Sequence, residues 1–160
     1  ASIPETDMWF LTLPQEIREN CTIVGRTPRN ELMELMKNAR VLLAPSLVDG
    51  VPNSLYEAMV NAAFPIVSPL DTIKPIVENE VNVLFARNLY PEEIRQALVR
   101  AMSDDALVDN AARNNLQLVK VIASRKVISR QVIEYYEHTT NHYRNAKIVS
   151  VNALIPAGEV

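Results

Sequence analysis

Asp49 and Glu57, separated by seven residues, lie in a polar stretch that follows the apolar run 41–44. Loop-forming residues fill the first part of this stretch, and a helix is expected over 55–63. In an α/β sheet the carboxyl ends of the strands face the ligand crevice, where a helix N-terminus offers unpaired N–H groups to phosphate. The two carboxylates could accept hydrogen bonds from sugar hydroxyls. This spacing therefore indicates a site for a ligand that carries both hydroxyls and phosphates.

An alternation of strands and helices must position this stretch. Strands are expected at 22–24, 41–44, 65–67 and 83–85. Helices are expected at 28–38 with Thr27 as N-cap, at 55–63, and briefly at 73–78. This order predicts a parallel sheet with crossover helices.

The two ends of the chain carry other elements. Residues 8–11 could form a short strand or a buried anchor, and 14–20 a short polar helix. From Pro91 onward three helices are expected, of which the second is capped around 103–105 and ends near 124, and the third covers 126–144. The tyrosines of the third helix are expected to take part in helix packing rather than in stacking on a base: Tyr135, Tyr136 and Tyr143. No clear element is expected over 148–160.

Asp49, Glu57 and the Ala58-Met59 that follows resemble the E-x7-E motif of the retaining GT-B glycosyltransferases of family 4, with Asp in the first acidic position. Residues 49–54 reproduce the D-G-x-P-N-S of a bacterial branch of that family. Segment 63–68 is similar to the family's next strand, and 76–79 and 81–85 are similar to the loop and strand after it. The resemblance covers residues 20–137.

The resemblance implies an α/β fold, namely the Rossmann-like carboxyl-terminal domain of a GT-B enzyme, with carboxyl-terminal helices. We expect this domain over 1–145 and a tail over 146–160. A further strand–helix–strand, with the basic residues that bind the donor diphosphate, would normally stand before the strand at 22–24. The sheet is therefore expected to be incomplete at its start, and the chain to be a fragment that lacks the acceptor domain.

Specific roles follow from the resemblance. Glu57 would accept hydrogen bonds from the ribose of a nucleotide sugar, and Asp49 would take the catalytic position and orient the transferred sugar. Backbone N–H groups of the loop and first helical turn would bind the diphosphate, except at Pro52, which has none. The expected substrate-binding residues are Glu57, Gly50, Val51, Asn53, Ser54, Ser46 and Arg26.

Each of these residues also has a simpler interpretation. Asp49 could be only a turn residue before Gly50, and Glu57 only a solvated helix glutamate. The side chains at 53 and 54 could be only helix caps, and Ser46 could merely end the strand. Arg26 could lie near the base or phosphate, or be a solvated loop arginine.

The implied function is transfer of a sugar from a nucleotide-diphosphate-sugar donor to a glycan, lipid or other acceptor, as in polysaccharide biosynthesis. The expected partners are the donor, the acceptor and the missing amino-terminal domain, and the parent protein could associate peripherally with a membrane. No cofactor and no metal are expected. At Pro52, Ala63 and Val83 the family often has glycine instead. Each change adds bulk near the expected crevice, which could mean a divergent donor pocket or reduced activity.

Two alternatives stay open. A non-catalytic GT-B module could bind a nucleotide sugar or a partner protein, whereas a sugar-nucleotide epimerase is disfavoured by the motif that ends in Ala58-Met59. His138 and His142, four residues apart, have a spacing that can bind zinc. Without an HExxH motif or a third ligand, an exposed polar face is favoured.

Composition narrows the class of protein. A length of 160 residues suits one domain, and a net charge of −3 gives no reason to expect nucleic acid or an anionic membrane. The single cysteine, Cys21, cannot form an internal disulfide and is expected in a strand core, so a reducing, cytoplasmic location fits. No apolar stretch in the sequence is long enough to cross a bilayer.

Overall fold

Three short parallel strands in the order β1-β2-β3 form the centre of the protein. The computed structural model describes the backbone of residues 4–152 and the side chains of residues 4–143. The elements are α1 (Pro4–Thr12), α2 (Gln15–Glu19), α3 (Arg29–Asn38), β1 (Val41–Ala44), α4 (Asn53–Val60), β2 (Phe64–Val67), β3 (Leu84–Phe85), α5 (Pro91–Ser103), α6 (Asp105–Ile122) and α7 (Arg125–Asn152). The expected α/β fold with a parallel sheet is confirmed.

The register of the sheet places the carboxyl ends of all three strands at one edge. Val41 pairs with Phe64 at the start of β1, and Ala44 pairs with Val67 at its end. Val67 in turn pairs with Phe85. Because the strands are parallel, the loops that leave β1, β2 and β3 all begin at this carboxyl edge.

Alternate side chains of β2 enter two separate hydrophobic clusters, one on each face of the sheet. Phe64 and Ile66 pack with α5 and the first half of α6. Val67 packs with α4, the turns after β2 and Val119 in the second half of α6. Every residue of β2 is buried, as expected for a parallel strand covered on both faces.

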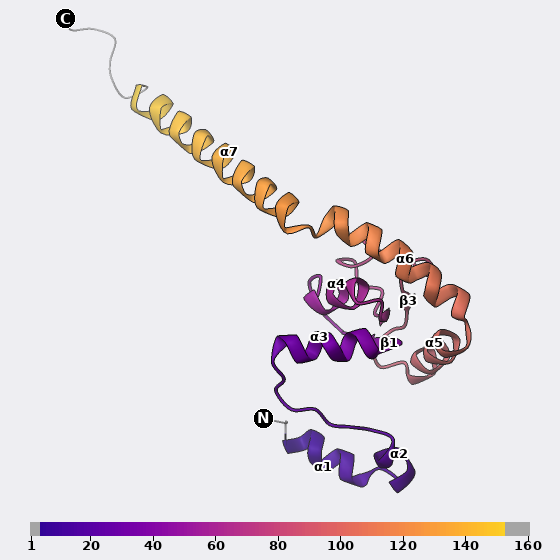
Figure 1. Ribbon diagram of the computed structural model, residues 1–160. Helices are drawn as coiled ribbons and strands as arrows, with labels where there is room; N and C mark the ends of the chain where they lie inside the picture. The colour runs from indigo at the N-terminus through magenta and orange to yellow at the C-terminus, as the bar shows by residue number, and fades with distance from the viewer. Residues whose placement is uncertain (1–3, 153–160) are drawn as a thin grey trace, which may run out of the picture.

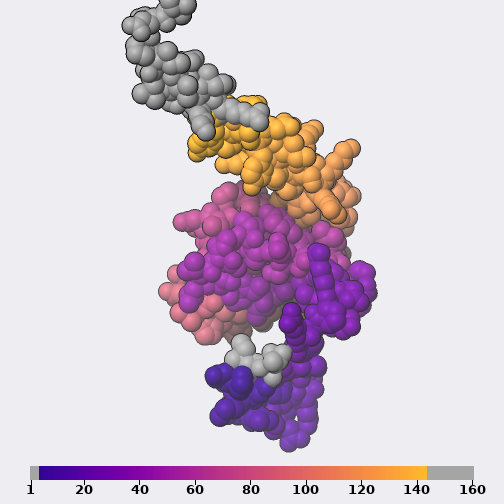
Figure 2. Space-filling view, turned by 90° about the vertical axis from the view of Figure 1, so that its left-hand side faces the viewer, coloured from indigo at the N-terminus to yellow at the C-terminus, as the bar shows by residue number. Residues whose placement is uncertain are grey.

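The helices lie as layers around this sheet, and the two ends of the chain extend beyond it. Figure 1 shows α7 projecting away from the body at the end of α6. In Figure 2 the amino-terminal segment, in indigo, lies at the opposite end of the molecule from the carboxyl-terminal helix. α6 begins as expected, because Asp104 Oδ1 accepts the Leu107 N–H at 2.9 Å.

The strand expected over 22–24 is wrong. Residues 21–25 form a loop in which Ile23 and Val24 are 41% and 54% exposed, and Cys21 is exposed rather than in a core. Residues 21–25 do not pair with the sheet, although within residues 4–152 β1 pairs only with β2 and its other edge is open. Without a hydrogen-bonded neighbour the segment does not form a strand.

Several other expectations also need correction. Residues 8–11 lie in α1, where Trp9 is exposed, because Pro4 and the acidic Glu5 and Asp7 favour a helix start. The segment 73–78 forms no helix, because Pro75 removes one N–H donor; successive turns cover 71–76 instead. The helical backbone of α7 continues through 148–152, where no element was expected.

Two side-chain expectations fail as well. The Thr27 hydroxyl donates to the Gly25 carbonyl at 2.9 Å instead of capping α3, because Pro28 holds the cap position. The three tyrosines of α7 are exposed instead of packed: Tyr135, Tyr136 and Tyr143. α7 projects beyond the sheet, so its apolar side has no core to join.

The end of α4 carries a residue with an unfavourable backbone conformation. The helix stops at Val60, three residues before the expected end, and the Ala63 N–H donates to the Ala58 carbonyl at 3.0 Å. Between them Ala62 has a φ of 61°, the left-handed region that costs an L-residue about 1–2 kcal/mol. Glycine is the residue that most often adopts this conformation at a helix end.

Substitution Ala62→Gly is therefore expected to raise the free energy of unfolding by about 0.5–1 kcal/mol, after the entropic cost of glycine is subtracted. Equilibrium unfolding in urea measures the change. Ala58→Gly, in the same helix but in ordinary helical conformation, should instead destabilise by about 1 kcal/mol or more. Equal destabilisation by both glycines would show that Ala62 is not strained.

Candidate functional site

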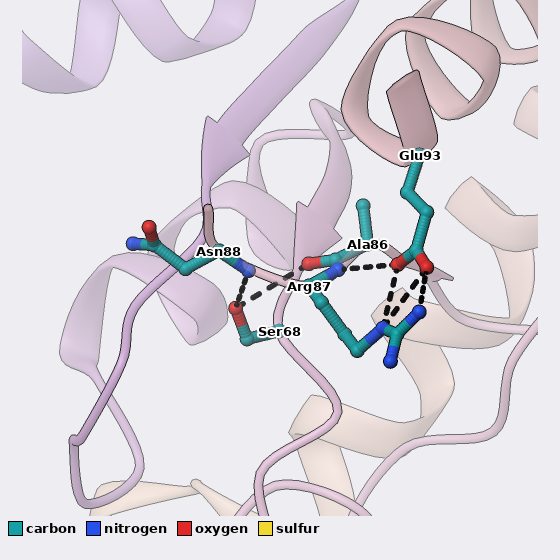
Figure 3. Close-up of polar contacts among 5 residues, drawn as sticks. All are labelled: Ser68, Ala86, Arg87, Asn88 and Glu93. Atoms are coloured by element: carbon teal, nitrogen blue, oxygen red, sulfur yellow. Dashed lines mark hydrogen bonds and ion pairs between the residues drawn. The ribbon is translucent and has the colours of Figure 1, made fainter. Parts of the chain in front are cut away.

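A buried serine joins the three loops at the carboxyl edge of the sheet. Ser68, which directly follows β2 and is 3% exposed, accepts the N–H of Ser46 at 3.1 Å and the N–H of Asn88 at 3.3 Å. Its hydroxyl donates to the Ala86 carbonyl at 3.3 Å. Figure 3 shows Ser68 between Ala86 and Asn88. A hydroxyl has one donor and two acceptor positions, so Ser68 uses all three.

Asn88 completes this connection between the loops. Its side-chain Nδ2 donates to the carbonyl of Pro45 at 2.9 Å, so the loop after β3 holds the loop after β1 directly. Together, Ser68 and Asn88 fix the start of the segment that leads to Asp49. Preorganised loops of this kind are what a precise binding site requires.

Substitution Ser68→Ala is expected to lower the free energy of unfolding by about 1–2 kcal/mol, because the N–H groups of Ser46 and Asn88 lose their acceptor. Urea unfolding measures the loss. The matched control is Ser103→Ala, since the Ser103 hydroxyl is exposed and only donates to a carbonyl of its own helix. If the control and Ser68→Ala were equally stable, the serine would not hold the loops together.

The loop after β3 is itself held by an ion pair. The Arg87 backbone N–H donates to Glu93 Oε2 at 3.1 Å, and the Arg87 Nε donates to Glu93 Oε1 at 2.9 Å (Figure 3). Hydrogen bonds from Arg87 hold the pKa of Glu93 below its ordinary value, and Glu93 raises the pKa of Arg87. The guanidinium also lies 3.9 Å from the centre of the Tyr90 ring. Arg87 is therefore engaged in holding its own loop.

The loop that carries Asp49 is tied to the loop after β2. The Thr72 hydroxyl lies 3.0 Å from the Asp49 carbonyl and 3.1 Å from the Gly50 carbonyl, to which it can donate. The Asp49 side chain is left exposed, and Val51 packs partly into the core beside α4. The Asp49 carboxylate can thus face a ligand in solution while its backbone is fixed.

α4 begins directly after this loop, at Asn53. Pro52 holds the cap position, and within residues 4–143 α4 has no capping hydrogen bond from a side chain. Asn53 and Ser54 are therefore not helix caps in this structure. Since the first N–H groups of a helix have no intrahelical partner, this end of α4 can receive an anion.

Glu57 lies one turn inside α4 and meets a cation that the sequence did not indicate. Arg29, the first residue of α3, places its Nη2 at 2.9 Å from Glu57 Oε1. The Arg29 side chain is 79% exposed and that of Glu57 21%. Arg26 lies in the exposed loop before α3 and joins no ion pair among residues 4–143.

The structure thus brings most of the expected residues together. Ser46 begins the loop, Asp49 to Val51 lie along it, and Asn53 to Glu57 form the first turns of α4. Arg26 lies in the exposed loop three residues before Arg29, and among residues 4–143 it forms no hydrogen bond to the other expected residues. The sequence analysis did not indicate four residues that hold or contact this site: Arg29, Ser68, Thr72 and Asn88. Of these, Ser68 had the clearest signal in the sequence, because it directly follows an apolar strand.

Comparison with known proteins identifies the family. The sequence profile of the glycosyl transferases group 1 family matches residues 10–117, more than half of the chain. The chain belongs to this family of glycosyltransferases. No curated protein matches this glycosyltransferase-family chain at the sequence level.

A solved structure agrees with the fold of this family. Sucrose-phosphate synthase from Thermosynechococcus elongatus superposes with a TM-score of 0.79 at 19% sequence identity. The match covers 89% of this chain and 37% of the synthase chain, so the glycosyltransferase-family chain spans well under half of that protein. At this identity the likeness establishes the fold alone, which is that of GT-B glycosyltransferases.

The described residues contain neither a membrane-spanning helix nor a cluster of metal ligands. No helix there is both long and apolar enough to span a bilayer. No cluster of three or more potential metal-ligating side chains (His, Cys, Asp or Glu) occurs there either, and His138 and His142 are exposed on α7.

Proposed function

We propose that this chain binds the donor of a retaining family 4 glycosyltransferase, which transfers a sugar from a nucleotide-diphosphate-sugar to a glycan, lipid or other acceptor. Membership of the glycosyl transferases group 1 family carries the proposal. The placement of Asp49, Glu57 and the start of α4 at the carboxyl edge of the sheet supports it, since ligands of open α/β sheets bind there.

Each residue has a role in this proposal. Glu57 accepts hydrogen bonds from the ribose hydroxyls, and Asp49 orients the transferred sugar. The N–H groups at 50, 51, 53 and 54 stabilise the negative charge of the diphosphate as it departs. Retention of configuration then follows from attack on the same face that the diphosphate leaves. Catalysis comes mainly from positioning and charge stabilisation, without a resident metal.

The setting of the reaction is part of the same proposal. An acceptor domain supplied by the parent protein would close over the carboxyl edge. The parent enzyme would act in the cytoplasm, with peripheral membrane association if the acceptor is a lipid.

A non-catalytic module that binds a nucleotide sugar or a partner protein is the second candidate. Donor binding is common to the enzyme and to a nucleotide-sugar module, so only sugar transfer separates these two.

The test is a calorimetric titration of the protein with UDP, GDP, ADP, CDP and dTDP, followed by the sugar conjugates of the nucleotide that binds. Release of nucleoside diphosphate from the conjugate, with the anomeric configuration of the product read by NMR, tests transfer and retention. Binding without transfer would favour the non-catalytic module, and inversion would contradict the retaining mechanism. If no nucleotide bound, donor binding would be refuted.

A further inference from the structure

Helices α3 and α4 run side by side in the same direction, and the first turn of α3 meets the second turn of α4 at Arg29 and Glu57. Arg29 contacts Glu57, and four residues further along each segment the amide of Asn61, which directly follows α4, contacts the sulfur of Met33 in α3 at 3.5 Å. Because the two contacts advance by four residues along both segments, the two helices run parallel. Because α4 starts from the loop that leaves the carboxyl end of β1, the first turn of α3 also lies at the carboxyl edge.

The Arg29–Glu57 ion pair is poorly explained as a stabilising contact. Arg29 is 79% exposed, and exposed ion pairs contribute only about 0–1 kcal/mol. An arginine in the first turn of a helix also opposes the helix dipole. Unlike Lys37–Glu34, which joins neighbours on one helix, this pair joins two separate segments of the chain, as Arg40–Asp105 and Arg100–Glu80 also do. A function at the carboxyl edge accounts for its position better.

The geometry of the ion pair leaves binding groups available. Arg29 occupies Glu57 Oε1, and no other hydrogen bond to this carboxylate is formed by residues 4–143. Glu57 Oε2 can therefore accept a hydroxyl. A guanidinium has five N–H donors, so most of those on Arg29 remain open to solvent. Its charge also offsets that of Glu57, beside which an anionic ligand would otherwise be repelled.

We infer that Arg29 is a positioning residue for Glu57, an inference that depends on the proposed donor function. Arg29 fixes one carboxylate oxygen, so the other is turned toward the ribose hydroxyls of the donor. The charge of Arg29 allows the diphosphate to approach a site that already contains two carboxylates. Discrimination between ribose and deoxyribose should then depend on Arg29 although Arg29 does not touch the ribose.

The experiment compares the affinity for a nucleoside diphosphate with that for its 2′-deoxy counterpart, for example UDP with dUDP or GDP with dGDP. In the unmodified protein the ribonucleotide should bind more tightly. Arg29→Ala should weaken ribonucleotide binding about 5- to 10-fold and reduce the ribose preference about 3- to 10-fold, the loss expected for one oriented hydrogen bond. Arg29→Lys, which keeps the charge, should restore part of both.

Lys37→Ala is the matched control, because Lys37 lies on the same helix in an exposed pair that does not involve the site. It should change neither affinity nor ribose preference. In the double variant Arg29→Ala/Glu57→Ala, the ribose preference should be no lower than in Glu57→Ala alone, since both substitutions act on it through the same contact.

Two results would overturn the inference, and they differ. If Arg29→Ala kept the ribose preference of the unmodified protein, Arg29 would not position Glu57, although the proposed donor function would stand. If the unmodified protein bound no nucleoside diphosphate, the donor function would fail and the role of Arg29 with it.

Discussion

Replacing Glu57 with alanine should weaken binding of the donor nucleotide about 30- to 100-fold. A hydrogen bond to a charged group contributes about 1.5–3 kcal/mol, and each 1.4 kcal/mol corresponds to a tenfold change in affinity. The carboxylate lies in the second turn of α4, beside the loop of Asp49. Among residues 4–143 its hydrogen-bond partner is the Arg29 side chain and no backbone group, so its removal should leave the surrounding backbone in place. Calorimetric titration with the preferred nucleoside diphosphate measures the loss.

Two variants make this test specific. Glu57→Gln keeps the shape of the side chain and one acceptor oxygen, and should fall between the unmodified protein and Glu57→Ala. Glu31→Ala removes an exposed carboxylate from the first turn of α3 and should leave the affinity unchanged. An affinity for the nucleotide that is the same in Glu57→Ala as in the unmodified protein would exclude this glutamate from the donor site.

The second large effect is expected in the interior, at Asn115. This residue of α6 is 1% exposed, and its Nδ2 donates to the Asn82 carbonyl at 2.8 Å. Its Oδ1 accepts the Asn82 Nδ2 at 2.9 Å, and the Asn82 Oδ1 accepts the N–H of Glu78 at 3.0 Å. The amide pair thus joins α6 to the turns that precede β3. Buried polar groups in such a network are costly to leave unpaired.

Substitution Asn115→Ala should lower the free energy of unfolding by about 2–4 kcal/mol, because the buried amide and carbonyl of Asn82 both lose their partners. Urea unfolding followed by circular dichroism measures the change. Asn114→Ala, one position away on the exposed side of α6, should change stability by less than about 0.5 kcal/mol. Similar stabilities for the two variants would mean that the amide pair contributes little.

The parts of the fold that depend on local pattern were predicted well. The apolar runs of β1 and β2 are strands, and Pro91 and Asp104 mark the starts of α5 and α6. The segment 22–24 has an equally good strand composition but forms a loop, because a strand depends on a neighbour that is distant in sequence. The composition of a short segment does not show whether a neighbouring strand is available for it to pair with.

The residues of the candidate site also fall into two groups, those that a local sequence pattern indicates and those that it does not. Asp49 and Glu57 are recognisable from their spacing, since the motif is local. Ser68 and Asn88 act through hydrogen bonds between three loops, and Arg29 meets Glu57 from a different helix. These contacts exist only after the strands have paired, so no local pattern could have indicated them.

The register of the sheet also bears on how the chain folds. Val41 pairs with Phe64 and Ile66 with Leu84, so each pairing closes a loop of about twenty residues. Doubling the length of such a loop would cost about 0.6 kcal/mol more in chain entropy. The sheet therefore forms from segments that are near neighbours in sequence, a topology of low contact order for parallel strands, which favours rapid folding.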